Sequence, residues 1–275
     1  MALSFPLSDA GLLVLQAGVV AAPRAAPRIR PLERFRGRGW ALVPIGSIVG
    51  VILAIRYASD TATGLTYLAL VAVPPLAALA LGWAMRGALP PLALAAVPLF
   101  LLAWLSKGSL VGQAAAAILS GLSCVSLGVL LAAVTPPTWL KLGIVAMAAA
   151  DAWLVISDLL QTPNATLVAA HPAGGLPRLQ TEIFGSAVMG YGDVFVAGLL
   201  GAVLASSVRE QRLAALLTLV IAGLFDLLFF VVNELPATVP VALALITVEV
   251  GKRIRLRSVA RSAPRLGKAA TRGRA

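Results

Sequence analysis

Apolar runs long enough to cross a lipid bilayer follow one another through most of this chain, and they limit what it can fold into. A bilayer core of about 30 Å needs roughly 20 apolar residues per helix, and only helices or closed barrels satisfy the backbone there. We therefore expect an all-α, polytopic integral membrane protein with eight transmembrane helices. The eight runs are Trp40–Tyr57, Gly64–Ala84, Ala88–Leu105, Leu110–Val134, Leu140–Leu160, Ile183–Ser207, Leu213–Val232 and Leu235–Val250.

The composition agrees with a membrane protein, because 60% of the residues are hydrophobic, only 12% are charged and the mean hydropathy is +0.95. Soluble domains have about 25% charged residues. The net charge of +11 could suggest nucleic acid. However, the basic residues gather in Arg24–Arg38 and Lys252–Arg274, beside apolar runs. Such flanks set orientation and attract anionic lipid headgroups. We expect contact with the lipid bilayer and no binding of nucleic acid.

The basic flanks also predict the orientation, because an even number of spans places both of them in the cytoplasm of a cell-membrane protein. The segment Phe5–Ala22 is ambiguous: it suits either a helix lying on the surface or a tilted ninth span. We divide the chain into an N-terminal segment (1–39), a transmembrane domain (40–250, with its catalytic part at 140–250) and a basic cytoplasmic tail (251–275).

Metal chemistry is not expected from this sequence. The single cysteine, Cys124, excludes an internal disulfide and a cysteine cluster, and the single histidine, His171, leaves no histidine-rich site. We expect no metal ion and no cofactor.

Carboxylates inside the apolar runs are the candidate functional residues, because a charge at bilayer depth costs roughly 2.5–3.5 kcal/mol on insertion scales. Asp151 lies 11 residues after Leu140, and Asp193 lies 10 residues after Ile183. At 1.5 Å per residue, these separations are about 16 and 15 Å. The two runs enter from opposite sides, so we predict that both carboxylates meet at the membrane midplane.

The other acidic residues of this half have different expected roles. Asp158 and Glu249 lie near the ends of their runs, where a solvated interfacial role fits best. Asp226 lies deeper and needs a partner or water. A structural hydrogen bond to a neighbouring span is the preferred role, and Asp226 remains a rival for the catalytic pair.

Two adjacent carboxyl groups share one proton, because like charges in close contact cannot both ionise. One can then activate water while the other protonates a carbonyl oxygen, which suits amide hydrolysis. Gly190 and Gly192 flank Tyr191 just before Asp193 and allow close approach of a helix or a substrate. The segment Leu235–Pro240 contains two prolines, which either open a cavity or mark a helix start.

These features together resemble the presenilin and signal-peptide-peptidase family of intramembrane aspartyl proteases. That family has an aspartate in one span, Gly-x-Gly-Asp in the next, one intervening span and Pro-Ala-Leu at the start of the last. The resemblance covers Leu140–Val250 and implies a presenilin-like fold with Asp151 and Asp193 as the catalytic pair. It also implies that Gly190, Tyr191, Gly192, Pro236 and Ala237 line the active site. Two departures from the family pattern are Ala150, where tyrosine is usual, and Thr238, where leucine is usual.

Two other families contain a similar string. Val188–Asp193 is similar to the Thr-Val-Gly-Tyr-Gly-Asp filter of potassium channels, whose backbone carbonyls replace the hydration shell of the ion, but Val188 stands in place of the threonine. Prepilin-type peptidases also contain Gly-x-Gly-Asp, yet Phe195 occupies the position where a basic residue is expected. The preferred hypothesis is an aspartic endopeptidase that cleaves membrane-protein or signal-peptide substrates, and the alternative is an ion channel or transporter. The sequence assigns no oligomeric state.

Overall fold

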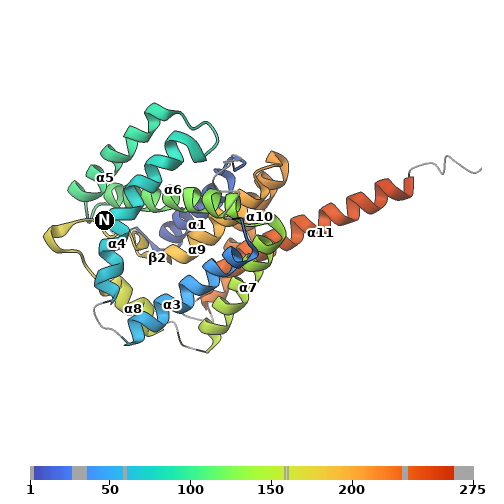
Figure 1. The fold of residues 1–275 in the computed structure, drawn as a ribbon. Coiled ribbons are helices and arrows are strands. Elements are labelled where there is room, and N and C mark those ends of the chain that lie inside the picture. The colour runs from blue at the N-terminus through green and yellow to red at the C-terminus, as the bar shows by residue number, and fades with distance from the viewer. Residues whose placement is uncertain are drawn as a thin grey trace, which may run out of the picture.

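The computed structural model describes residues 3–26, 36–57, 61–157, 159, 161–230 and 235–262. It is mostly helical. Four helices in this part of the chain are long and apolar enough to cross a membrane, namely Thr61–Ala84, Leu110–Val134, Pro137–Ile156 and Val208–Phe229. Three shorter apolar helices accompany them: Phe5–Ala21, Pro90–Leu105 and Tyr191–Leu204. The broad class, a mostly helical chain with helices suited to a membrane, agrees with the sequence-based prediction (Figure 1).

The described residues form helices, short helical turns and two strands. In chain order they are α1 (Phe5–Ala21), η1 (Arg38–Leu42), α3 (Val43–Tyr57), α4 (Thr61–Leu79), η2 (Ala80–Ala84), η3 (Pro90–Ala95), α5 (Ala96–Leu105), α6 (Leu110–Val134), α7 (Pro137–Ile156), α8 (Gln161–Ala169), η4 (Ala173–Gly175), β1 (Thr181–Phe184), β2 (Ala187–Gly190), α9 (Tyr191–Leu204), α10 (Val208–Phe225), η5 (Asp226–Phe230) and α11 (Thr238–Ser262).

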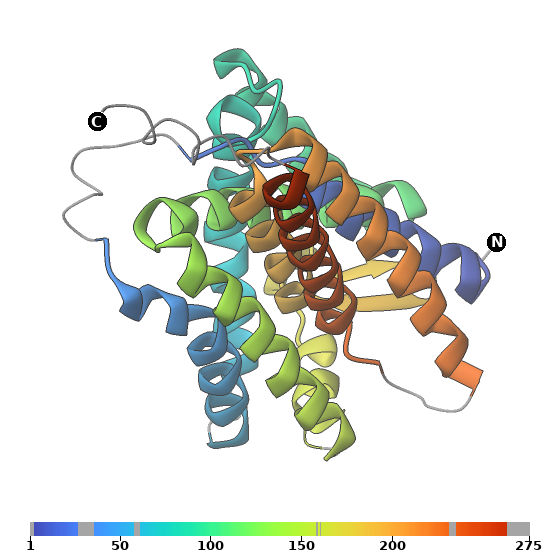
Figure 2. The same cartoon turned by 90° about the vertical axis from the view of Figure 1, so that its right-hand side faces the viewer.

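Helix α9 lies in the middle of the bundle and is enclosed by α1, α6, α7, α10 and α11 (Figures 1 and 2). Most of its side chains are buried, from Val194 through Ala202. Its closest neighbour is α6, because a Cβ atom on Gly198 would collide with the carbonyl of Cys124. A Cβ atom on Gly128 would collide in turn with the carbonyl of Gly198. Small residues let helix backbones approach this closely in membrane proteins.

Helix α1 belongs to this core, so of the two alternatives left open for Phe5–Ala22, a helix lying on the surface does not fit. It packs against α9, α10 and α6. Leu12 and Val20 are almost fully buried there. The physical reason is its apolar composition, which lets α1 bury side chains against neighbours on several sides rather than along one stripe.

The predicted span Ile183–Ser207 is not one helix, and this changes the position of Asp193. Strands β1 and β2 form an antiparallel hairpin in which Thr181 faces Gly190 and Phe184 faces Ala187. Gly185 turns the hairpin with a φ of 59°, a conformation that favours glycine. Asp193 is therefore the third residue of α9, and the helix-rise estimate from Ile183 does not apply. The hairpin packs against α6 and α1, and protein burial is the setting in which non-helical backbone is tolerated at membrane depth.

Three further boundaries differ from the prediction. The expected loop Gln161–Glu182 contains α8, η4 and the start of β1. The last helix begins at Thr238, so Pro236 precedes it and Pro240 lies in its first turn, which agrees with a proline-marked helix start. Helix α11 continues past Val250 to Ser262, and its basic extension projects from the bundle (Figure 1). Residues 27–35 and 263–275 of the basic segments lie outside the described residues.

Candidate functional site

Helices α7, α9 and α11 pack against one another. Of the residues predicted for the active site, α7 holds Asp151 and α9 holds Asp193, while Pro236 and Ala237 directly precede α11. Asp151 is on α7 and only 8% exposed. Asp193 is on the first turn of α9 and partly buried. The two carboxyl groups lie close enough to interact electrostatically. The two residues are 42 positions apart in the sequence, and Asp193 enters this region from a hairpin rather than from the middle of a helix.

Thr238 is a site residue that the sequence analysis treated only as a departure from the family pattern. Its hydroxyl Oγ1 donates a hydrogen bond to Oδ2 of Asp151 over 2.6 Å. Both side chains are buried. A leucine at this position would offer no donor, so the departure supplies Asp151 with a direct partner. Hydrogen bonds to charged groups contribute about 1.5–3 kcal/mol.

Gly190 and Asp193 form a compact turn at the start of α9. The Gly190 backbone N–H donates to Oδ2 of Asp193 over 3.2 Å, and a Cβ atom on Gly190 would lie 2.9 Å from that oxygen. A larger residue would crowd the carboxylate at this point. Between them, Tyr191 is tied to α6, since its hydroxyl and Ser123 Oγ are 2.7 Å apart. Gly192 is partly buried in the same turn.

Gln16 of α1 connects the site to the proline segment and was missed in the sequence. Its Nε2 donates to the carbonyl of Ala237 over 3.1 Å and approaches the carbonyl of Asp193 at 3.5 Å. The side chain is fully buried, and its Oε1 has no partner among the described residues. Gln16 thereby holds the backbone just before Thr238 next to the first turn of α9. The feature of the sequence that pointed to Gln16 was its amide side chain within an otherwise apolar run.

Glu182 is a third buried carboxyl group near Asp193 that the sequence analysis did not single out. It is only 1% exposed, and neither carboxyl oxygen has a hydrogen-bond partner within the described chain. Burial raises the pKa of the Glu182 carboxyl well above its ordinary value, and the charge of Asp193 adds to this effect. Glu182 therefore stays protonated over a wider pH range than an exposed glutamate.

The remaining carboxylates lie elsewhere. Asp226 has a hydrogen-bonding partner in Asp9 of α1, which agrees with the structural role preferred for it. Glu249 forms an ion pair of 2.6 Å with Lys141 of α7. Asp158 lies outside the described residues. In the part of the chain that the structure describes, no three His, Cys, Asp or Glu side chains are grouped so that they could hold a metal ion.

Comparisons with protein-family models, with curated proteins and with solved structures found no match to this chain. The resemblance to presenilin-type proteases rests on the residues of the chain itself.

Proposed function

We propose that this protein is an intramembrane aspartyl protease that hydrolyses peptide bonds in transmembrane helices or signal-peptide remnants. The observation that supports this most is the meeting of Asp151, Asp193 and the Pro236–Thr238 segment, which come from three separate helices. Thr238 contacts Asp151 directly, and Gln16 ties Ala237 to the backbone of Asp193. A presenilin-like fold, a cell-membrane location and a cytoplasmic tail belong to the same proposal.

In the proposed mechanism the two carboxyl groups share one proton. The hydrogen bonds described above fall on Oδ2 of each carboxyl group, so Oδ1 is the atom we assign to the shared proton and the attacking water. The ionised carboxylate takes a proton from water as the water oxygen attacks the substrate carbonyl carbon. The protonated carboxyl donates its proton to the carbonyl oxygen. As the tetrahedral intermediate collapses and the C–N bond breaks, the leaving nitrogen receives the proton from the first aspartate, and the second aspartate takes a proton from one hydroxyl of the intermediate, which restores the shared proton.

The surroundings suit this chemistry. The substrate helix must unwind locally, because an intact helix hides its carbonyls in its own hydrogen-bond ladder. A hairpin directly precedes α9, and residues 235–237 before α11 are not helical, so the chain is non-helical immediately before both of these helices. We do not assign the acid and the base individually, since a coupled pair titrates as a unit.

The channel alternative draws no support from the local backbone. A filter needs consecutive carbonyls that face an ion path. Here Gly190 pairs with Thr181 in the hairpin, and Tyr191 begins α9. The N–H groups of this first helical turn, rather than its carbonyls, point away from the helix body.

The test is cleavage of a reporter membrane helix by the full-length protein in vesicles. Asp151→Ala and Asp193→Ala should each abolish cleavage while the thermal unfolding midpoint in detergent stays within a few degrees of that of the original protein. Cleavage that survives Asp151→Ala would overturn the pair as drawn. Potassium flux into the same vesicles that is lost in Gly190→Ala or Gly192→Ala would favour the channel instead.

A further inference from the structure

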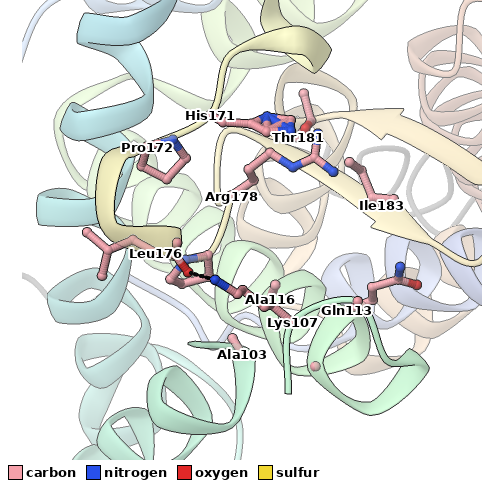
Figure 3. A pocket seen from close by; sticks show the side chains of 14 residues that line it. Ala103, Lys107, Gln113, Ala116, His171, Pro172, Leu176, Arg178, Thr181 and Ile183 are labelled. Carbon is pink, nitrogen blue, oxygen red and sulfur yellow. Dashed lines mark hydrogen bonds between the residues drawn. The ribbon is translucent and has the colours of Figure 1, made fainter. Parts of the chain in front are cut away.

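A cavity of about 360 Å³ lies away from the aspartate pair, between the α5–α6 turn, the segment around η4 and the start of β1 (Figure 3). It has room for roughly ten water molecules at about 30 Å³ each. Lys107, Gly108 and His171 at its rim are exposed to solvent. The cavity therefore opens at the protein surface, near the N-terminal end of α6, which begins at Leu110.

Two of the side chains that line the cavity, Lys107 and Arg178, are cationic, and no acid among the lining residues balances them. Lys107, His171 and Arg178 line it, and none of its lining residues is Asp or Glu. Lys107 Nζ donates to the carbonyl of Gly175 over 2.9 Å, as Figure 3 shows, and Arg178 donates to the carbonyl of Val168 over 2.8 Å. Both hydrogen bonds go to neutral backbone groups. The two positive charges therefore remain available to an anion.

A buried hydroxyl in the same wall lacks a partner. Thr181 is only 7% exposed, and its Oγ1 makes no hydrogen bond with any described residue. Burial of a hydroxyl without a partner costs about 1–3 kcal/mol in proteins. Thr181 lines the cavity, but its hydroxyl lies beneath the wall without access to solvent, so an oxygen-rich ligand would satisfy this group once the side chain turns toward the cavity. Thr181 is thus an observation independent of the two cations, and it points to the same kind of ligand.

The position of Lys107 is held by its surroundings. Gly175 has a φ of 66°, and a Cβ atom there would collide with the Lys107 ammonium group. The adjacent backbone is anchored as well, since Ala173 N donates to the Tyr67 hydroxyl over 3.1 Å. A glycine at position 175 therefore allows the lysine to lie against the loop, and the arrangement exists before any ligand binds.

We propose that this cavity binds a phosphate group, held by Lys107 and Arg178 and accepting a hydrogen bond from Thr181. Phosphate oxygens suit this set because they accept several charge-assisted hydrogen bonds at once. Apolar side chains, including Ala103, Ala116 and Leu176, also line the cavity, and Figure 3 shows these three near Lys107. Leu105 and Val111 nearby are 76% and 58% exposed. The same phosphate chemistry is offered by a phospholipid headgroup and by free phosphate.

The experiment uses the full-length protein in micelles of a neutral detergent, and titration calorimetry measures binding. The probes are inorganic phosphate, a short-chain phosphatidylglycerol, and a diacylglycerol of the same chain length without phosphate. Saturable binding of phosphatidylglycerol alone supports the proposal with a lipid as the source. Binding of both phosphate compounds with similar affinity supports it with free phosphate as the source. Binding of the diacylglycerol as tightly as the phospholipid, or binding of none, overturns it.

Variants locate the binding. Lys107→Gln with Arg178→Gln should weaken the binding of the phosphate compound at least about 10-fold. The matched control is Arg209→Gln with Arg212→Gln, which removes the same charge from exposed positions on α10 and should leave the affinity within about 2-fold. Thr181→Val should weaken binding about 3-fold or more and keep the fold, because it removes a hydroxyl that has no protein partner. Unchanged affinity in both cavity variants, or an equal loss in the control, overturns the proposal.

Discussion

Two pairs of carboxyl groups join neighbouring helices in this molecule, and their settings differ. Asp193 and Asp151 lie where the buried helix α9 meets α7, and each receives a hydrogen bond on Oδ2. Asp226 and Asp9 lie between α10 and α1. The side chain of Leu227, next to Asp226, is 60% exposed. Both pairs satisfy the simple criterion of two acids in one apolar bundle.

The backbone separates the two pairs. Around Asp193 the chain has a hairpin before the helix, and the segment that contains Pro236 lies close by. Near Asp226 and Asp9, the aromatic rings of Phe5 and Phe229 pack edge to face at 5.5 Å. They link α1 to η5, the element that begins at Asp226. Two carboxylates in a membrane bundle do not by themselves mark a catalytic site. Irregular backbone and a set of hydrogen-bond donors beside them are what distinguish the candidate.

The largest expected effect is a contrast between the two pairs. Asp193→Asn should reduce cleavage of a reporter helix by at least about 100-fold, since loss of a general acid or base costs this much or more. Asp226→Asn should leave cleavage within about 3-fold, because asparagine can still form the hydrogen bond to Asp9. Initial rates in vesicles at equal protein amounts measure both. Equal losses of cleavage in the two variants would mean that the Asp151–Asp193 pair does not differ in role from the Asp9–Asp226 pair.

The packing of α9 predicts the next effect. Gly198→Ala should lower the free energy of unfolding by about 1–3 kcal/mol or more, because its Cβ atom would meet the Cys124 carbonyl, a backbone group that cannot turn aside. Gly223→Ala on α10 is the matched control. Nothing lies within 4 Å of its Cβ position, and it should be neutral or stabilise by about 0.5–1 kcal/mol. Denaturant unfolding in micelles gives both values, and equal losses would mean that α9 is not the tightly packed helix.

Thr238 sharpens the comparison, because the partner found for Asp226 among the described residues is the carboxyl group of Asp9 rather than a hydroxyl. Thr238→Val should lower the rate of cleavage about 10-fold or more, since a hydrogen bond to a charged group contributes about 1.5–3 kcal/mol. Thr238→Ser should restore most of the rate, because it returns the hydroxyl. If Thr238 only filled space, Thr238→Val would keep the cleavage rate and Thr238→Ser would lower it. The rates are compared at one pH with the thermal midpoint as a check on folding.

The sequence was sufficient for the parts of the site that depend on local pattern. Apolar run length predicted the boundaries of α6. The depth argument for Asp151 and Asp193 assumed a helix from Ile183, and the hairpin removes that assumption. The sequence was insufficient where tertiary contacts decide the local structure. Residues 183–190 are apolar enough to be counted in the predicted span Ile183–Ser207. They belong to a hairpin instead, because Gly185 permits the turn and neighbouring helices cover the strands.

The missed residues share one physical cause. Gln16 and Glu182 are polar groups whose role depends on which helix lies opposite, and apolar run length carries no information on that. Thr238 was visible only as a deviation from a family pattern. Its meaning required the distance to Asp151, which sequence spacing cannot supply across 87 residues. Helix pairing, rather than helix existence, was the information that the chain alone lacked.

The smallest expected effect concerns Glu182, the third carboxyl group beside the Asp193 pair. For an acid whose pKa is higher in the folded chain than in the unfolded chain, the folded state binds more protons between the two values. The favourable contribution is thus fully present below the unfolded value of about 4.3 and is lost as the pH rises toward the folded pKa. Glu182→Gln should remove this loss. The variant should therefore be about 1 kcal/mol more stable near neutral pH, at the lower end of the cost of an unpartnered buried polar group.

The measurement is the thermal unfolding midpoint of the full-length protein in micelles as a function of pH. Glu182→Gln should flatten the decline in midpoint above about pH 4.3. Glu210→Gln is the control, because Glu210 is partly exposed and paired with Lys252 at 3.2 Å, and exposed ion pairs contribute about 0–1 kcal/mol. It should leave the decline in place. If Glu182→Gln keeps the original pH dependence, the Glu182 carboxyl is solvated rather than buried beside Asp193. The candidate site would then contain two interacting carboxyl groups, as the Asp9–Asp226 pair does, rather than three.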